Sequence, residues 1–266
     1  MTEANFTRDP EIIKTVPNVD ICACQVPLPF EFSMAFQPIW DHKLQRVFAY
    51  EALARGVNGE GAGTILSQVT QKIKYAFDQA SRVTAIRLAT ELGMPDGAYL
   101  SINFLPNAIY DPETCIRATL DAARLYDFPH NRIMFEMTEH ESMGDTSHFK
   151  TIIEAYQRLG FTTAIDDFGE GYSGLNLLSN FQPDIIKIDM HLVQGIARDP
   201  VKRAIVRGIT VMALDLGIDL VAEGVERKED FRELADMGVR YFQGYLLARP
   251  GFQAMPEVDL SAISSG

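Results

Sequence analysis

The sequence predicts an α/β fold in which a parallel sheet closes into an eight-stranded barrel. Its 266 residues, of which 47% are hydrophobic, suit one barrel-sized domain with a large core. Amphipathic helices alternate with short apolar strands along the chain, and this alternation indicates right-handed crossovers between parallel strands. Alternation alone also allows a doubly wound open sheet. Eight strand candidates in an unbroken row favour the barrel.

The first two strand candidates are residues 33–40, SMAFQPIW, and residues 46–54, RVFAYEALA. Because side chains alternate along a strand, one face of the second strand is expected to carry Val47, Ala49, Glu51, Leu53 and Arg55. A carboxylate and a guanidinium among apolar neighbours are costly unless each has a partner. Two interpretations are open: the stretch is structural, as an ion pair or a solvated edge, or it belongs to a functional site.

Later strands each follow a helix that ends at glycine. Residues 148–159 carry apolar side chains at helical spacing and stop at Gly160, before the strand candidate 162–168. Helices that end at Gly217 and at Gly238 likewise precede strand candidates. The remaining strand candidates are residues 98–104, 132–139, 183–189, 219–224 and 239–246.

Composition and charge exclude several function classes. No apolar run approaches the roughly 18 residues of a membrane span, and the first residues lack the order of a signal peptide, which predicts a cytoplasmic protein without a membrane partner. A net charge of −12 argues against a long nucleic acid, although a small phosphate ligand is compatible if metal ions supply positive charge. No glycine-rich dinucleotide or Walker-type loop follows a strand. Cys22, Cys24 and Cys115 suit neither a disulfide framework nor a zinc site.

Polar side chains close most of the predicted strands. These side chains are Asn103, Glu136, Asp166 with Asp167, Lys187, Glu223 and Gln243. Any one of them alone is explained as a cap between strand and loop. In a parallel barrel, however, all of these strand ends meet at the carboxyl face, where barrel enzymes keep their chemistry. So many acids in one place repel one another unless cations lie between them, which indicates divalent metal.

The ligand chemistry narrows the choice of metal. Carboxylate and amide oxygens without His or Cys suit Mg²⁺ or Mn²⁺ rather than zinc. The adjacent pair Asp166 and Asp167 suggests two ions, an arrangement that recurs in phosphodiester hydrolysis. Glu51 then becomes a candidate metal ligand from the second strand, Leu53 an apolar wall and Arg55 a bidentate partner for phosphate.

Seven motifs in this order and spacing resemble the EAL domain, the bacterial cyclic-di-GMP phosphodiesterase family. They are EALAR, SINF, FEMTE, DDFGEGYSG, IIKID, AEGVE and QGYLLARP, and they extend from about Phe32 to Pro250. The resemblance implies a phosphodiesterase domain over residues 31–255, with a lead of residues 1–30 and a tail of residues 256–266. It also implies a barrel variant whose first strand runs antiparallel to the others.

The resemblance assigns a role to each candidate residue. One metal ion would be held by Glu51, Asn103, Glu136 and Asp166, and a second by Asp166, Asp167 and Glu223. Of the groups closest to the chemistry, Glu223 resembles the acid that binds or activates the attacking water, and Lys187 the lysine that orients it. The positions that match those lining the dinucleotide are Gln37, Leu53, Arg55 and Gln243. Glu139 resembles the acid that anchors the aspartate loop, and Glu226 belongs to the same supporting shell.

Two segments depart from the family pattern. RGVNGEGAGTIL follows Arg55, where family members often have an aromatic residue and a His-Pro turn. Glu170 stands between the glycines of the aspartate loop, where Thr or Ala is common, and adds a negative charge beside the site. Both departures concern the entrance of the predicted site and the placement of its loop.

The sequence leaves three functions to compare. The first is hydrolysis of cyclic di-GMP to linear 5′-pGpG by a water molecule that two metal ions activate. The second is a catalytically weak EAL domain that serves as a cyclic-di-GMP receptor or protein-interaction module. The third, a metal-dependent barrel enzyme for a small carboxylate, explains the paired aspartates less well. Every metal and water position is filled, which favours the hydrolase. A homodimer is also expected, through Leu175, Leu177, Leu178 and Phe181 beside the aspartate loop. A helix that faces the core is the other explanation for the same leucines.

Overall fold

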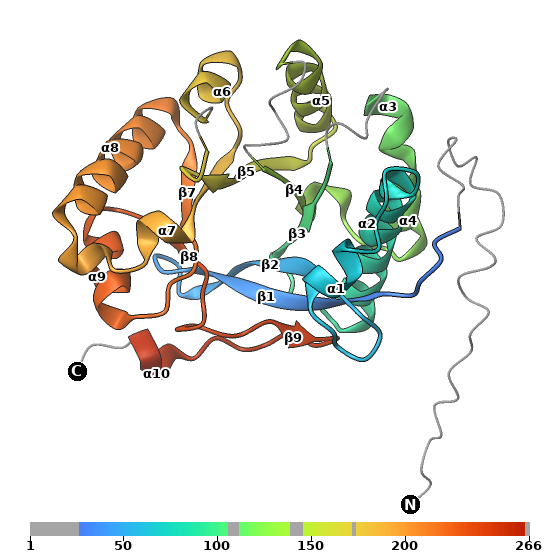
Figure 1. Ribbon diagram of the computed structural model, residues 1–266, viewed down its shortest axis with the longest axis horizontal. Coiled ribbons are helices and arrows are strands. Elements are labelled where there is room, and N and C mark those ends of the chain that lie inside the picture. Colours follow the sequence, from blue (N-terminus) through green and yellow to red (C-terminus); the bar gives the residue numbers. More distant parts are fainter. Residues whose placement is uncertain (1–26, 106–111, 139–145, 172–173, 264–266) are drawn as a thin grey trace, which may run out of the picture.

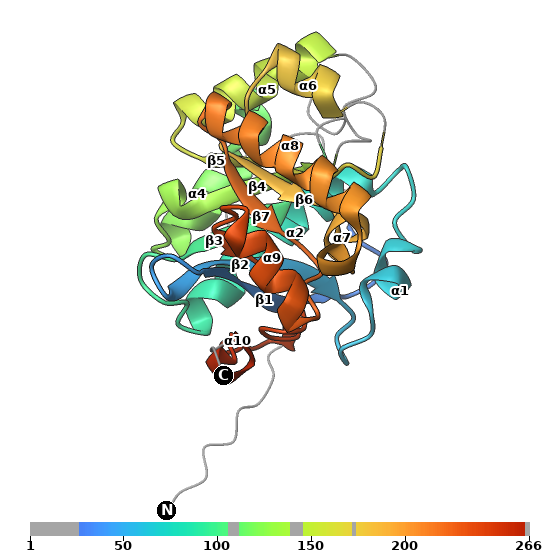
Figure 2. The same cartoon turned by 90° about the vertical axis from the view of Figure 1, so that its left-hand side faces the viewer.

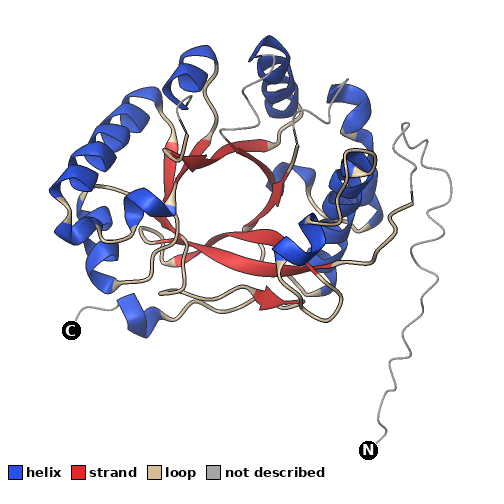
Figure 3. Cartoon of the chain, viewed as in Figure 1, coloured by secondary structure: helices blue, strands red, loops and turns tan. Residues whose placement is uncertain are grey.

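A computed structural model describes residues 27–105, 112–138, 146–171 and 174–263 and shows a closed barrel with helices around it (Figures 1 and 3). Its strands are β1 Ser33–Asp41, β2 Arg46–Arg55, β3 Tyr99–Asn103, β4 Ile133–Thr138, β5 Thr162–Phe168, β6 Ile185–Ile188, β7 Asp219–Ala222, β8 Tyr241–Phe242 and β9 Gly251–Phe252. Strands β2 to β8 are parallel neighbours in chain order, and β1 closes the ring between β8 and β2. The predicted barrel is therefore confirmed.

Strand β1 runs antiparallel to both of its barrel neighbours, as the family resemblance implied. Only four residues separate β1 from β2, and so short a connection joins antiparallel strands but not parallel ones. Within this turn Asp41 Oδ1 accepts hydrogen bonds from the backbone N–H groups of Lys43 and Leu44, both at 3.0 Å. The Arg240 side chain donates to the same carboxylate, with Nη2 2.7 Å from Oδ2. Because Arg240 directly precedes β8, this contact connects the turn after β1 to β8.

One expectation about β2 is wrong, because its alternation is interrupted. Ile39 pairs with Ala49 but the next residue of β1 pairs with Val47, so Phe48 is an extra residue in a β-bulge. Phe48 packs against the interior of the barrel with Ala49, whereas Val47 packs against the outer core. The face predicted for Val47 therefore belongs to Phe48. Beyond the bulge, Ala49 and Glu51 lie on the inner face as expected, and Tyr50 on the outer.

The outer ring consists mainly of helices that follow the strands. The longer ones are α2 Lys74–Glu91, α4 Arg117–Leu125, α5 Thr146–Arg158, α6 Gly174–Asn180, α8 Pro200–Leu216 and α9 Lys228–Asp236. The shorter ones are α1 Ala62–Leu66, α3 Pro112–Cys115, α7 Met190–Val193 and α10 Leu260–Ile263, with 3₁₀ turns at His130–Arg132 and Ile196–Arg198. As predicted, α5, α8 and α9 end within two residues of Gly160, Gly217 and Gly238, each of which has positive φ. Across the described ranges, none of the helices has the length and apolar character that crossing a bilayer requires.

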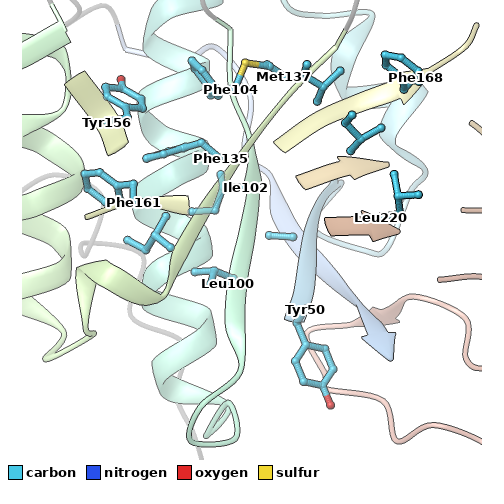
Figure 4. Packing of buried hydrophobic residues seen from close by; sticks show 14 of the residues in the cluster. Tyr50, Leu100, Ile102, Phe104, Phe135, Met137, Tyr156, Phe161, Phe168 and Leu220 are labelled. Carbon is cyan, nitrogen blue, oxygen red and sulfur yellow. The ribbon is translucent and has the colours of Figure 1, made fainter. Parts of the chain in front are cut away.

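The main core lies between the barrel wall and the helices. Phe135 on β4 packs against Tyr156 of α5 and Phe161, with ring centroids 5.0 and 5.1 Å away, and against Phe104, 5.4 Å away (Figure 4). All four rings are buried. This aromatic layer holds α5 against β3 and β4, which is the part of the barrel that carries the Asn103 and Glu136 strand ends.

Three of the four residues expected in a dimer contact are buried, two in helix α6 and one directly after it. Leu177, Leu178 and Phe181 are buried in the core, so the core-facing interpretation is correct for them. Leu175, on the same helix, is 67% exposed. Elsewhere in the described part of the chain, Cys115 is buried and forms no disulfide, in line with the prediction of an ordinary cysteine.

Strand β9 was not predicted. It pairs antiparallel with Ala35 and Phe36 of β1. Strand β8 is only two residues long and pairs with Trp40 and Asp41, so it provides no partner for this earlier part of β1. The chain after β9 continues along the barrel, where Tyr50 Oη donates to the carbonyl oxygen of Pro256 at 3.0 Å. Two residues cannot be recognised as a strand from periodicity, because their pairing depends on the edge that β1 offers.

A buried ion pair connects α2 to the barrel. The Arg82 guanidinium is fully buried, and its Nη2 lies 2.5 Å from Oδ2 of Asp78, one turn earlier on the helix. Oδ1 of Asp78 accepts the backbone N–H of Leu105 at 3.0 Å, just after β3. The guanidinium also lies over the rings of Phe104 and Phe135, 5.6 and 5.3 Å from their centroids. One carboxylate thus neutralises a buried cation and fixes the loop after β3.

We expect Asp78→Ala to lower the free energy of unfolding by about 3–5 kcal/mol, because it leaves the Arg82 cation buried without a countercharge. Asp121→Ala is the matched control, since Asp121 pairs with Arg124 on the surface, and it should cost less than about 1 kcal/mol. Urea unfolding followed by circular dichroism measures both. Equal losses in the two variants would contradict the role given to burial.

Candidate functional site

The polar residues predicted at the strand ends come together around one lysine. Lys187 Nζ, on β6, lies 2.6 Å from Glu223 Oε1, 2.7 Å from Glu136 Oε2 and 2.9 Å from Asp166 Oδ1. Glu51 Oε2, on β2, lies 3.6 Å away. Four strands on different sides of the barrel therefore direct carboxylates at a single ammonium group.

The Lys187 ammonium is completely buried, and its surroundings explain why it stays charged there. Burial disfavours the charged form, but the carboxylates of Asp166, Glu136 and Glu223 outweigh it and hold the pKa of Lys187 well above its usual value. Burying the Lys187 ammonium alone would be costly, and the surrounding carboxylates offset that cost. Conversely, this cation allows those acids to approach one another.

One ammonium does not neutralise all of the acids. Burial raises the pKa of Glu136 to about 8, against the attraction of Lys187 and with the charge of Glu51 adding to the rise. Burial and then the charge of Asp166 raise the pKa of Asp167 to about 6, with a contribution from Glu170, and they raise the pKa of Glu223 well above its usual value. The site is therefore short of positive charge, which is the condition that favours cations.

The acids form two overlapping groups that could each hold an ion. In the first group, Glu51, Glu136 and Asp166 each offer an oxygen within 4.8 Å of the others, and in the second Asp166, Asp167 and Glu223 do so. Asp166 belongs to both groups. The donors are all carboxylate oxygens, which suit a hard divalent cation. The residues present thus fit the two-ion arrangement expected from the sequence.

A β-bulge allows the adjacent aspartates to serve the same site. Ile165 pairs with Ile186 and Phe168 with Ile188, so that Asp166 and Asp167 together stand opposite Lys187 alone. In a regular strand, neighbouring side chains would point to opposite faces. Asp167 takes a left-handed backbone with φ of 54°, a conformation that Asp tolerates better than most residues. The paired aspartates predicted from the sequence therefore depend on an irregularity in β5.

Each carboxylate oxygen of Glu51 accepts a hydrogen bond from an amide side chain. Gln243 Nε2 donates to Glu51 Oε2 at 2.6 Å, and Asn103 Nδ2 donates to Glu51 Oε1 at 3.0 Å. Gln37, on β1, accepts a longer hydrogen bond of 3.3 Å from Gln243 and donates to the carbonyl oxygen of Ala248 at 3.1 Å. These contacts join the predicted dinucleotide residues on β1 and β8 to the acidic cluster.

Leu53 and Arg55 are half-buried toward the end of β2, beyond Glu51. Arg55 Nη1 donates to the carbonyl oxygen of Ala54 at 2.8 Å. The ionic partner of Glu51 is Lys187 from across the barrel. Glu51 and Arg55 therefore do not form the structural ion pair that was one interpretation of this strand. Arg55 instead lies at the rim of the site.

One contact of the site was not predicted from the sequence. Ser101, two residues before Asn103 on β3, is fully buried and donates its hydroxyl hydrogen to Glu136 Oε1. Strand alternation places Ser101 and Asn103 on one face, so the signal was present in SINF. Of the two loop-anchoring candidates, Glu226 is exposed in the loop after β7, and Glu139 lies outside the described residues. Glu170 is exposed after β5.

Fold and site together define a barrel protein with an all-oxygen acidic centre at the carboxyl ends of its strands. A family model described as the EAL domain matches residues 30–250. The chain belongs to the EAL domain family, and the resemblance drawn from its seven motifs is confirmed.

Several named relatives and solved structures are similar to this chain. A standalone versatile EAL protein from Vibrio cholerae O395, in its c-di-GMP bound form, is 50% identical with a TM-score of 0.86, over 90% of this chain and 100% of that one. BlrP1 of Klebsiella pneumoniae, in a manganese/cy-diGMP complex at pH 9.0, is 35% identical with a TM-score of 0.81, over 87% and 59%.

Curated relatives include both regulators and enzymes. The blue light- and temperature-regulated antirepressor BluF of Escherichia coli is 30% identical over 90% of this chain, and the probable cyclic di-GMP phosphodiesterase PdeA of the same organism is 34% identical over 61%. This chain spans 59% of BluF and 22% of PdeA. Membership of the family therefore does not by itself choose between catalysis and regulation.

Without metal, we expect the free energy of unfolding of the wild-type protein to fall as pH rises from about 5 to 8, when compared with that of the Glu136→Gln variant. The folded-state pKa of Glu136 is raised to about 8, so in this range the folded state binds more protons than the unfolded chain. Stability is favoured below the range and falls by at most about 1.4 kcal/mol per pH unit. Urea unfolding in EDTA at pH 5, 6.5 and 8 measures the difference. A difference that is constant or grows with pH would contradict the raised pKa.

Proposed function

We propose that this chain hydrolyses cyclic di-GMP to linear 5′-pGpG with the help of two divalent ions, Mg²⁺ or Mn²⁺. The observation that carries the proposal is the shared position of Asp166 in two acidic groups that converge on Lys187. The cyclic-di-GMP complexes of the Vibrio protein and of BlrP1 with manganese support the same ligand and class of metal.

The first ion would be held by Glu51, Asn103, Glu136 and Asp166, and the second by Asp166, Asp167 and Glu223. When bound, such ions polarise the phosphodiester and make water a stronger nucleophile near neutral pH. The raised pKa values of Glu136 and Asp167 mean that ion binding would compete with protons.

Lys187 and Glu223 are the groups suited to orient the attacking water and to accept its proton. The ammonium has three N–H donors, of which one donates to Glu136 Oε2 at 2.7 Å, and it forms ion pairs with Glu223 Oε1 at 2.6 Å and Asp166 Oδ1 at 2.9 Å. With these acids bound to cations, a donor of Lys187 would be available to orient the attacking water. Glu223 lies at the open side of the cluster, where its carboxylate can accept a proton from that water.

The rim of the site supplies groups for the dinucleotide. Arg55 offers a guanidinium for a phosphate oxygen, and Leu53 beside it offers apolar surface to a base. Gln243, which donates to Glu51, and Gln37, which accepts from Gln243, offer amide groups next to the acidic cluster. These assignments come from the family resemblance and from the position of the four residues around the acidic centre.

The second candidate is a cyclic-di-GMP receptor or protein-interaction module without effective turnover. The similarity to the antirepressor BluF favours it. A complete set of acids, with the charge deficit that their raised pKa values reveal, favours hydrolysis. A homodimer and a cytoplasmic location stay predictions, and of the residues expected in a dimer contact Leu175 remains at the surface.

Incubation of the protein with cyclic di-GMP should give linear pGpG in Mg²⁺ or Mn²⁺ and almost none after EDTA treatment, measured by chromatography. Calcium should support binding but little turnover, because its longer bonds and looser geometry misplace the reacting groups. Tight binding without product in any metal would establish the receptor function instead.

Two single variants separate chemistry from binding. Glu223→Gln keeps the shape of the side chain but removes its basic oxygen, so kcat should fall by roughly 100-fold or more with a small change in KM. Arg55→Ala should mainly raise KM, since losing a charge-assisted contact costs about 1.5–3 kcal/mol. Steady-state and single-turnover kinetics in Mn²⁺ distinguish the two. Near-normal single-turnover rates for Glu223→Gln would remove it from the chemical step.

A further inference from the structure

The short helix α7 lies between the two loops that carry the proposed second ion site. It follows β6 directly, on the same side of the barrel as the carboxyl end of that strand (Figure 2). Backbone hydrogen bonds connect its base to both neighbours. The N–H of Asp189 donates to the carbonyl oxygen of Phe168 at 3.2 Å, and the N–H of Glu223 donates to that of Ile188 at 3.2 Å.

Each neighbouring loop contacts α7 through a glycine at which an added Cβ atom would overlap a residue of α7. Gly169, two residues after Asp167, has φ of 101°, and a Cβ atom there would lie 2.5 Å from Cδ1 of Leu192. Gly224, directly after Glu223, has φ of 62°, and its Cβ would lie 2.5 Å from Cβ of Met190. Both loops are therefore in close contact with α7 immediately beyond a candidate ligand.

The two contacts differ in which atoms make them. A Cβ atom at Gly224 would meet the Cβ of Met190 and, at 3.4 Å, its Cα, atoms that alanine also has, while Met190 as a whole is 41% exposed. Leu192 meets Gly169 with the end of its side chain and is half-buried. Only the Leu192 contact therefore depends on the identity of the side chain.

Asp167 is the residue that needs such support. It occupies a left-handed conformation at a β-bulge, and such conformations persist only where the surrounding structure holds them. Its loop leaves the barrel wall after Phe168 and passes over α7 at Gly169. A side chain that fills the space under Gly169 limits how far this loop can relax.

We propose that Leu192 is a positioning residue for the second ion site. By packing under Gly169 it holds the Asp167 carboxylate at its place opposite Glu223, and so sets the affinity for the ion that Asp166, Asp167 and Glu223 would share. This inference rests on the proposed function, because it assumes that the acids bind cations. It assigns to an apolar side chain outside the acidic cluster a role in metal affinity.

The test is direct binding of Mn²⁺ to the full chain without substrate, by electron paramagnetic resonance titration of free Mn²⁺. Wild type should bind two ions. Leu192→Ala should keep one site and weaken the other by roughly 10-fold or more, the scale seen when a group that orients a ligand is lost. Leu192→Met, which restores a long side chain, should recover most of the affinity. Met190→Ala is the matched control and should bind as wild type does.

Three outcomes would overturn the inference. They are unchanged Mn²⁺ affinity in Leu192→Ala, an equal loss in Met190→Ala, and the absence of Mn²⁺ binding by wild type. If Leu192→Ala does not fold, Leu192→Val takes its place, because it shortens the side chain that reaches Gly169. A weakened site in Leu192→Val with wild-type affinity in Met190→Ala supports the inference, and wild-type affinity in both overturns it. Wild type that binds two ions but forms no pGpG would contradict the proposed hydrolysis while leaving the role of Leu192 intact.

Discussion

The buried ammonium of Lys187 is the constraint on which the rest of the structure depends. Glu136, Asp166 and Glu223 lie within 2.9 Å of it, and they come from three different strands of the barrel. Without a cation the carboxyl ends of these strands would carry like charges in contact, and the barrel could close only with those acids protonated or turned away. The same group that makes closure possible leaves a deficit of positive charge, because one ammonium faces more acids than it neutralises. Stability of the metal-free fold and affinity for cations therefore arise from one arrangement.

The two ends of the barrel interior are built from opposite chemistry. At the amino end the Phe48 ring stacks on Tyr241, with centroids 4.1 Å apart, and lies 5.2 Å from Tyr99, so aromatic rings fill the interior. A middle layer of small and aliphatic side chains, which includes Ala49 and Val221, separates these rings from the acids. The bulge in β2 makes this possible by turning Phe48 inward. An apolar floor beneath a polar cluster excludes water from below, which strengthens every electrostatic interaction around Lys187.

Local irregularities lie where the site needs them. The bulge in β5 turns Asp166 and Asp167 to the same side of the strand, and the left-handed backbone of Asp167 is the conformational cost of that arrangement. The loop beyond it passes α7 at Gly169, a position that only glycine fills without displacing Leu192. Alternation alone thus positions Glu136, and also Glu51 in the regular part of β2 beyond its bulge, while a strained turn with support from a neighbouring element positions Asp167.

The sequence by itself determined the barrel, the strand that carries each acid and the family, because each of these follows from short-range periodicity or from motifs such as DDFG. Alternation placed Glu51 inside the barrel, and it also placed Ser101 and Asn103 on one face. Only the tertiary structure decided which groups meet. The ionic partner of Glu51 is Lys187, 136 positions later, rather than Arg55 in its own strand. The inward turn of Phe48, the pairing of β9 and the contact under Gly169 were equally hidden. Each of these depends on the space and hydrogen-bonding groups that a distant segment offers, and periodicity along one segment carries no information about its neighbours.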